Sequence, residues 1–514
     1  MKITILETSD MHAYISDKSF AETNKSELFS MSKIKTYIDQ VRSENDFVLY
    51  IDNGDNIQGS PLGTFYHNNN DIKNLASSYN LLNPDAIVLG NHDFNYGKEY
   101  LKSYIDYLDA PVLSANTLQN DSSYLNIKPY IIKKVGNIKI GILGITTQYI
   151  PNWEKPQNIH GLSFKSAMET AEHYLPILKS EEKCDIVIVS YHGGFAKDLE
   201  TGRELTPQTG ENEGYDLLFS DLNFDVFLTG HTHKEIAGIY NDIVVTQPGF
   251  AGGKISEISL YIDEDKNLVD REVKLVDMAE IIPNEELEKL VEDDLVGVNE
   301  YLDQKCGQIS PSALIDSVRE AQIEGHPYIN LINQIQMDYA DCDIAAIAIY
   351  SLDAKGIPND VTMRDIFSNY RFNNILMKIE VSGKEFKEIL EYNSNYFMLD
   401  EEGCLVQNPE YFIFNYDIYS GVNYTFDYTR EKGDRLISAI YKGHEITDDE
   451  KITFATNNYR AIGGGDFPVL DGTQIIWESV LEMPQLIFEY IQNKKLVKIR
   501  DLDTVNIIGF KDVK

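Results

Sequence analysis

The sequence predicts an α/β layered domain, then a linking helix, then a second α+β domain. Its 514 residues exceed the length that one hydrophobic core usually supports, so two domains are expected. From residue 2 to about residue 276, short apolar runs alternate with helix-like stretches, which is typical of strands covered on both faces. Beyond about residue 311 the pattern changes to a helix, tyrosine-rich strands and turn clusters.

The first domain is expected to cover residues 1–276. Its helix-like stretches lie at 25–44, 71–82 and 97–108. Five of its apolar runs lead directly into polar clusters, and these runs with their clusters occupy 2–12, 46–56, 85–94, 184–194 and 224–233. Ligands of layered α/β domains bind beyond the carboxyl ends of the strands, so these clusters are the candidate site.

The stretch 277–310 is expected to be a linking helix on the exposed side of the molecule. It is highly charged, has Pro283 near its start and carries no polar cluster of the strand-end kind. Residues 311–514 then form the predicted second domain, which begins with a helix over 326–340.

Composition excludes several classes of protein. The formal charge of −37 would repel a polyanion over most of the surface, so a nucleic acid polymer is not an expected partner. The four cysteines are scattered and give neither a disulfide framework nor a zinc ribbon. No apolar run approaches the roughly 18 residues of a membrane span. With no apolar targeting stretch before the first strand, a cytoplasmic protein is expected, although a secreted form after processing would look identical.

The polar clusters at the strand ends contain the residue types that bind metals. Taken singly, a strand-end Asp or Asn usually caps a helix, and a lone histidine is usually a packed polar group. Five of the ten histidines nevertheless fall at these ends, where parallel strands would bring them together. The candidate ligands are Asp10, His12, Asp55, Asn91, His192, His231 and His233.

Seven donors exceed the four ligands of one structural zinc, so two divalent metal ions are expected. Imidazole together with carboxylate and amide oxygen leaves Mn, Zn, Fe and Co all open. A hydroxide shared by two such ions is a nucleophile at neutral pH, and two metals about 3.5 to 4 Å apart can clamp a phosphoryl displacement.

The stretches DMH, GDN, GNHD, HGG and GHTH, in this order, resemble the signature of calcineurin-like metallophosphoesterases. The resemblance implies a β-sandwich flanked by helices. It also implies that Asp10, His12, Asp55 and His233 bind one metal and that Asp55, Asn91, His192 and His231 bind the other, with Asp55 bridging. In that family His92 would face the substrate as a catalytic residue, and Asp93 would hydrogen-bond it.

The pairing of this domain with residues 311–514 resembles two-domain nucleotidases, in which the second domain holds the base between two aromatic rings. The resemblance implies a small nucleotide as the partner, with Tyr416 and Tyr459 as the two rings. Asn374 is a further candidate nucleotide contact, with a turn or cap role as the alternative. The number of subunits cannot be predicted from the sequence.

The second domain also bears on which nucleotide is hydrolysed. The Asn-x-Gly-Gly-x-Arg segment of the 5′-nucleotidase branch is absent, and residues 343–376 look more like 2′,3′-cyclic-nucleotide 2′-phosphodiesterase/3′-nucleotidases. A metal-dependent enzyme of that kind is expected. The alternatives are a 5′-nucleotidase or nucleotide-sugar hydrolase with the same metal site, a non-catalytic nucleotide sensor, and a structural surface protein.

Overall fold

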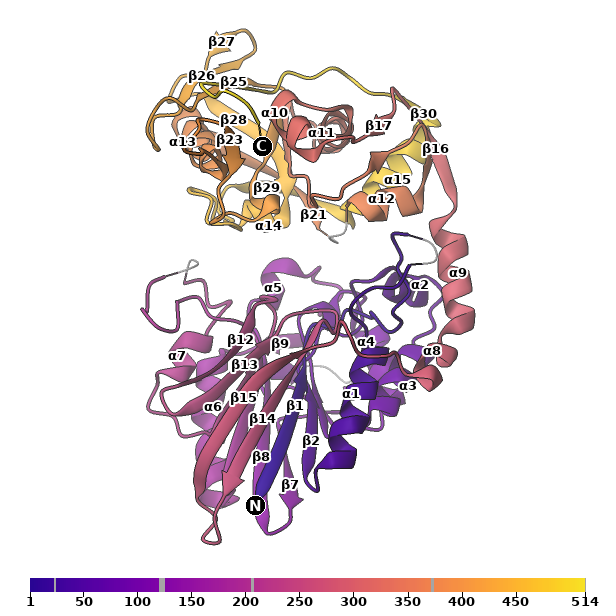
Figure 1. The fold of residues 1–514 in the computed structure, drawn as a ribbon, viewed down its shortest axis with the longest axis vertical. Coiled ribbons are helices and arrows are strands. Elements are labelled where there is room, and N and C mark those ends of the chain that lie inside the picture. The colour runs from indigo at the N-terminus through magenta and orange to yellow at the C-terminus, as the bar shows by residue number, and fades with distance from the viewer. Residues whose placement is uncertain (23–24, 120–124, 205–207, 371–373, 514) are drawn as a thin grey trace. The chain divides into compact units, whose positions relative to one another are not determined.

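The computed structural model describes residues 1–22, 25–119, 125–204, 208–370 and 374–513 (Figure 1). The chain forms two compact units, the first made of residues 1–19 and 23–299, the second of residues 20–22 and 300–514. Among the described residues, no helix has both the length and the apolar character needed to cross a membrane.

The first unit contains two large sheets. One has the strand order β15 (Leu268–Asp277), β14 (Lys254–Ile262), β1 (Lys2–Thr8), β2 (Val48–Asp52), β3 (Ala86–Val88), β4 (Val112–Leu113) and β6 (Ile127–Lys128). The other has the order β12 (Glu235–Tyr240), β13 (Ile243–Pro248), β11 (Val226–Thr229), β10 (Ile186–His192), β8 (Ile138–Thr146) and β7 (Tyr130–Val135). A small pair joins β5 (Thr117–Gln119) to β9 (Leu162–Phe164).

The main core of this unit lies between the two sheets. Ile5 and Ile51 of the first sheet belong to the same buried cluster as Ile142 and Ile188 of the second. Helices cover the outer faces, and a second cluster packs α6 (Ala167–Pro176) and α7 (Gly214–Leu218) against the six-stranded sheet (Figure 1). The remaining helices are α1 (Met31–Glu44), α2 (Pro61–Asn68), α3 (Lys73–Leu82), α4 (Lys98–Tyr107) and α5 (Ile150–Trp153), with a 3₁₀ turn η1 (His92–Phe94) and a π-helical stretch η2 (Ile177–Glu181). The predicted β-sandwich flanked by helices is confirmed.

Parallel pairing in the centre of each sheet decides where the polar clusters lie. Strands β1, β2 and β3 run parallel, as do β8, β10 and β11. Their carboxyl ends therefore meet at one end of the sandwich. Each predicted ligand follows such an end or, for His192, occupies it.

The expected linking helix is shorter than the sequence suggested. Two helices, α8 (Glu285–Leu290) and α9 (Glu292–Leu302), are followed by a strand, β16 (Lys305–Ser310), which pairs with β20 (Asp360–Thr362) and β30 (Leu496–Lys498). Gly307 lies in this strand with φ of 156° and approaches the Lys495 carbonyl so closely that a Cβ would lie 2.9 Å from it. The helical prediction for 303–310 was therefore wrong, because residues 305–310 pair with two neighbouring strands and the φ of Gly307 lies outside the helical range.

The second unit has the predicted α+β character. Its central sheet has the order β24 (Ile418–Ser420), β18 (Ile344–Ile347), β28 (Lys451–Asn457), β21 (Ile375–Ser382) and β29 (Ile475–Glu482). A four-stranded sheet contains β27 (His444–Glu445), β26 (Leu436–Tyr441), β25 (Asn423–Asp427) and β31 (Val505–Ile508), and the strand pairs are β17 (Ala313–Leu314) with β19 (Gly356–Ile357) and β22 (Phe397–Leu399) with β23 (Leu405–Gln407). The helices are α10 (Val318–Glu324), α11 (Pro327–Ala340), α12 (Met363–Asn369), α13 (Gly383–Asn393), α14 (Asn458–Ala461) and α15 (Met483–Lys494), with 3₁₀ turns η3 (Ser394–Tyr396) and η4 (Ile413–Asn415).

Candidate metal centre

The backbone at the strand ends adopts an uncommon conformation. Five predicted ligands have φ between 49° and 69°, and these are Asp10, His12, Asp55, His231 and His233. Residues other than glycine seldom occupy this left-handed region, and each costs on the order of 1 kcal/mol or more. Backbone hydrogen bonds hold the turns, since the Asp10 N–H donates to the Gly54 carbonyl and the His12 N–H to the Asp55 carbonyl, both at 2.8 Å. The surrounding fold thus fixes these side chains in place.

Three of the predicted ligands form one group. Ligand atoms of Asp10, His12 and His233 all lie within 4.8 Å of one another. The Nε2 atoms of His12 and His233 are 3.1 Å apart, and His233 Nε2 is 3.4 Å from Asp10 Oδ1. Asp10 and His12 are buried, whereas the His233 side chain is 38% exposed.

The other four predicted ligands form a second group. Asp55, His192 and His231 meet the same distance criterion. Asn91 joins them, because its Oδ1 lies 3.2 Å from His192 Nε2 and 2.8 Å from His231 Nδ1. His192 Nε2 is 3.1 Å from Asp55 Oδ2 and 3.9 Å from Asp10 Oδ1, so the two groups are adjacent. All seven predicted ligands are therefore brought together, and the bridging role of Asp55 stays a prediction.

The donor set fits two cations. The second ring nitrogens of His192 and His12 face backbone carbonyls, with His192 Nδ1 at 2.6 Å from Asn53 O and His12 Nδ1 at 2.7 Å from Gln58 O. Each Nδ1 therefore carries the hydrogen, and each neutral ring presents a lone pair at Nε2. For His192 that lone pair faces the oxygens of Asp55 and Asn91, an arrangement that a cation stabilises.

In the absence of metals, a proton on the His192 ring supplies the positive charge that stabilises this arrangement. Burial alone would lower the pKa of His192, but the carboxylates of Asp55 and Asp10 raise it to about 10. Burial alone would raise the pKa of Asp10, but the imidazoles of His192 and His233 bring it down to about 2. Burial lowers the pKa of His12 to about 4, against the opposing effect of Asp55. Ligand protons must therefore leave when metals bind.

One supporting residue of the second group was missed by the sequence analysis. Glu211 Oε1 lies 2.8 Å from His231 Nε2, so this carboxylate can take the ring hydrogen while Nδ1 faces the metal side. Glu211 stands in a loop between β10 and α7, twenty residues from His231 in sequence. No sequence motif marks it.

The predicted partner of His92 is wrong. The Asp93 carboxylate instead accepts hydrogen bonds from four backbone N–H groups, those of Asp55, Asn56, Ile57 and Gly90, at 2.8 to 3.2 Å. Asp93 therefore holds the Asp55 turn against the end of β3. Burial, together with the nearby Asp55 charge, raises the pKa of Asp93 to about 6.

His92 itself contacts a different residue, Asn95. Its Nδ1 lies 2.6 Å from Asn95 Oδ1, and its backbone N–H donates to Asp55 Oδ1 at 2.7 Å. The physical reason is the 3₁₀ turn at His92–Phe94, which places a residue three positions on beside the ring and turns the next residue away. In the sequence, a polar residue three positions after His92 was the feature that could have predicted this contact.

The predicted base-stacking pair is partly wrong. Tyr416 is fully buried, with its ring stacked on Tyr396 at 4.9 Å between centroids, so no face is open to a base. Tyr459 is 40% exposed, and the centroid of the Phe414 ring lies 6.3 Å from that of Tyr459, with the two rings nearly perpendicular. Asn374 donates to Asn458 Oδ1 at 3.1 Å and so lies next to the Tyr459 segment.

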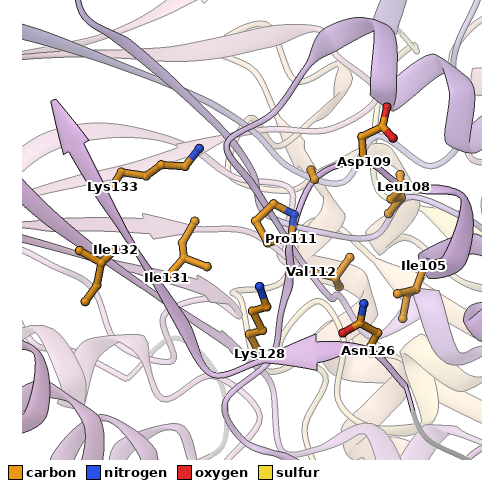
Figure 2. Close-up of a pocket in the computed structure, with 11 residues that line it drawn as sticks. Ile105, Leu108, Asp109, Pro111, Val112, Asn126, Lys128, Ile131, Ile132 and Lys133 are labelled. Atoms are coloured by element: carbon orange, nitrogen blue, oxygen red, sulfur yellow. The ribbon is translucent and has the colours of Figure 1, made fainter.

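A cavity elsewhere in the first unit is not this site. It has a volume of about 350 Å³ and is lined by the end of α4, the segment to β4 and strand β7, including Ile105, Lys128 and Lys133 (Figure 2). None of the strand-end residues lines it.

Comparison with known proteins agrees with both units. Residues 3–235 match the family model of calcineurin-like phosphoesterases, and residues 306–472 match that of the 5′-nucleotidase C-terminal domain. A solved Staphylococcus aureus structure assigned as a 5′-nucleotidase is 34% identical, with a TM-score of 0.83 over 99% of this chain and 100% of that one.

Two curated bacterial relatives are more distant. The 2′,3′-cyclic-nucleotide 2′-phosphodiesterase/3′-nucleotidase of Haemophilus influenzae is 25% identical over 95% of this chain and 84% of its own length. The trifunctional nucleotide phosphoesterase protein YfkN of Bacillus subtilis is 27% identical over 96% of this chain, which spans only 38% of that protein. The fold, the paired ligand groups and these matches together show that the chain belongs to the family that joins a calcineurin-like phosphoesterase domain to a 5′-nucleotidase C-terminal domain.

Proposed function

We propose that this protein hydrolyses nucleotide phosphoesters with two divalent cations, opening 2′,3′-cyclic nucleotides and then removing the 3′-phosphate. The observation that carries the proposal is the pair of adjacent ligand groups at one end of the sandwich. The name of the Haemophilus influenzae relative supports the choice of nucleotide, and that of the Bacillus subtilis relative supports hydrolysis of nucleotide phosphoesters.

The chain's own residues have separable tasks in this reaction. When bound, two divalent cations would supply Lewis-acid chemistry that activates water and stabilises charge on the phosphoryl group. Asp10, His12 and His233 would hold one cation, and Asp55, Asn91, His192 and His231 the other. His92 is not part of either group, so its ring can donate a proton to the departing ribose oxygen.

The second unit supplies a surface for the base. Tyr459 and Phe414 are the rings we assign to this role, in place of the predicted Tyr459 and Tyr416, because the Tyr416 ring is buried. Arg460 contacts both residues, with its guanidinium 5.6 Å from the centroid of the Tyr459 ring and bonded to the Phe414 backbone. It is 1% exposed, pairs with Asp417 at 2.6 Å, and donates to the Phe414 carbonyl at 2.9 Å.

A substrate panel on metal-reconstituted protein tests the proposal. We expect kcat/KM for 2′,3′-cyclic AMP and 3′-AMP to exceed that for 5′-AMP by at least about tenfold. Asp55→Asn should lose activity together with bound metal, whereas His92→Ala should keep metal and lose about 10²-fold or more in kcat. Full activity in His92→Ala would contradict the assigned role of His92.

A 5′-nucleotidase is the second candidate. It is favoured by the 34% identity to the Staphylococcus aureus structure. A preference for 5′-AMP in the same panel would overturn our choice of nucleotide and leave the metal chemistry intact.

A further inference from the structure

We infer that Asn95 and Glu154 are positioning residues that fix the ring of His92. The Asn95 amide contacts the ring, and the Glu154 carboxylate contacts that amide. This inference deepens the proposed function and rests on it, because His92 needs a fixed orientation only if it serves a reaction at its other nitrogen.

The contacts form an unbroken chain. His92 Nδ1 lies 2.6 Å from Asn95 Oδ1, and Asn95 Nδ2 donates to Glu154 Oε2 at 2.6 Å. The other oxygen, Glu154 Oε1, accepts from the Lys155 N–H at 2.8 Å and from Asn158 Nδ2 at 2.9 Å. Glu154 is 9% exposed, so this carboxylate is held by several donors in a buried position.

The carboxylate decides which way the Asn95 amide points. An ionised carboxylate only accepts hydrogen bonds, so the NH₂ end of Asn95 must face Glu154 and the carbonyl end must face His92. The carbonyl in turn accepts only from an N–H, so His92 carries its hydrogen on Nδ1. Its Nε2 is then the atom left to exchange a proton with a substrate.

The backbone makes this arrangement rigid. Asn158 Nδ2 also donates to the backbone carbonyl of Asn95 at 2.7 Å, and the backbone N–H of Asn95 donates to the backbone carbonyl of His92 at 3.3 Å. Glu154 caps the short helix α5, where its N–H donates to the Ile150 carbonyl at 2.9 Å. Asp93 cannot substitute, since four backbone N–H groups occupy its carboxylate.

Splitting the amide from the carboxylate has a chemical consequence. A carboxylate in direct contact with an imidazole strongly favours the charged ring, whereas an amide fixes the tautomer without contributing a full charge. Here Glu154 contacts the Asn95 amide rather than the His92 ring.

Exchanging the two groups is the sharpest test. Asn95→Asp alone places two carboxylates in contact, and Glu154→Gln alone leaves the Asn95 amide free to turn. We expect each to lower kcat for 3′-AMP about tenfold or more with KM changed less than about twofold. The double variant N95D/E154Q restores one carboxylate and one amide, and should recover most of kcat. Asn152→Asp, an exposed change of the same charge on α5, is the control and should leave kcat unchanged.

Two readouts separate positioning from loss of structure. Metal content and melting temperature should match wild type in all variants. The loss in kcat should also shrink to less than about threefold for a p-nitrophenyl phosphoester, whose leaving group needs little protonation. A loss of equal size for both leaving groups, or a double variant no better than the singles, would overturn the inference.

A spectroscopic readout does not depend on activity. In metal-free protein labelled with ¹⁵N-histidine, at a pH where the ring is neutral, His92 should show the Nδ1–H tautomer, and Asn95→Ala should shift it toward Nε2–H. An Nε2–H tautomer in wild type would overturn the inference. If nucleotides are not hydrolysed but the tautomer behaves as expected, the proposed function fails and the positioning stands.

Discussion

Glu7 is a carboxylic acid in a strand whose side chains are buried from Ile3 to Thr8, and its environment could not be predicted from the sequence. It lies in β1 with no exposed surface, three residues before Asp10. Burial raises its pKa from 4.5 to about 8, with the nearby hydroxyls of Thr246 and Ser256 opposing the shift. The sequence does not single out this position, because one Glu within a strand is not part of a motif.

The raised pKa of Glu7 predicts a pH-dependent stability. Below pH 4.5 the carboxyl is protonated in both states, but between pH 4.5 and about 8 the unfolded chain releases the proton and the folded protein retains it. Stability therefore falls as pH rises, by up to about 1.4 kcal/mol per pH unit for this group. Glu7→Gln removes this loss, so the metal-free variant should gain stability relative to wild type from pH 5 to pH 8.

Urea unfolding of metal-free protein at several pH values measures the effect. Glu264→Gln, which removes an exposed carboxylate in a turn, controls for loss of surface charge. A difference between Glu7→Gln and wild type that does not change with pH would contradict the prediction.

At the scale of elements, the turn after β3 shows how closely the strand ends are packed. The residue at which the chain turns away from the sheet edge after β3 is a glycine, Gly90. Only the structure shows the cause, because a Cβ on Gly90 would lie 2.1 Å from Asp55 Oδ1 and 2.4 Å from the Asp55 nitrogen. The glycine allows two strand ends to touch, and Asp93 ties them together.

Gly90→Ala is therefore expected to displace Asp55 and damage the second ligand group. We predict the loss of at least one bound metal per chain and a fall in kcat of about 10²-fold or more. Gly253→Ala is the matched control, since its added methyl would find its nearest neighbour at 3.5 Å. Metal analysis by mass spectrometry and steady-state kinetics measure both; retention of two metals by Gly90→Ala would contradict the argument.

At the scale of the whole molecule, the two units divide the work. The first unit contains all seven predicted metal ligands, and the second contains the two rings assigned to the base, the exposed Tyr459 and the half-buried Phe414. The chemistry of a phosphoester should therefore be separable from recognition of the nucleoside.

Phe414→Ala tests this division. Base stacking contributes roughly 1 to 3 kcal/mol, so KM for 3′-AMP should rise about tenfold. The kcat/KM for p-nitrophenyl phosphate, which has no base, should change less than about twofold. Phe219→Ala removes a partly exposed ring of the first unit and should affect neither substrate. Equal losses for both substrates would show that Phe414 supports the fold or the metals rather than the base.

The sequence by itself determined the fold class and the seven candidate ligands, because strand-end His, Asp and Asn residues leave a local pattern of residue type and spacing. Tertiary structure decided the partners. Asn95 rather than Asp93 contacts His92, Glu211 supports His231, and Tyr416 is buried while Phe414 lies beside Tyr459. These partners depend on the direction in which a 3₁₀ turn points each side chain and on contacts between loops distant in sequence. Neither can be predicted from the order of neighbouring residues.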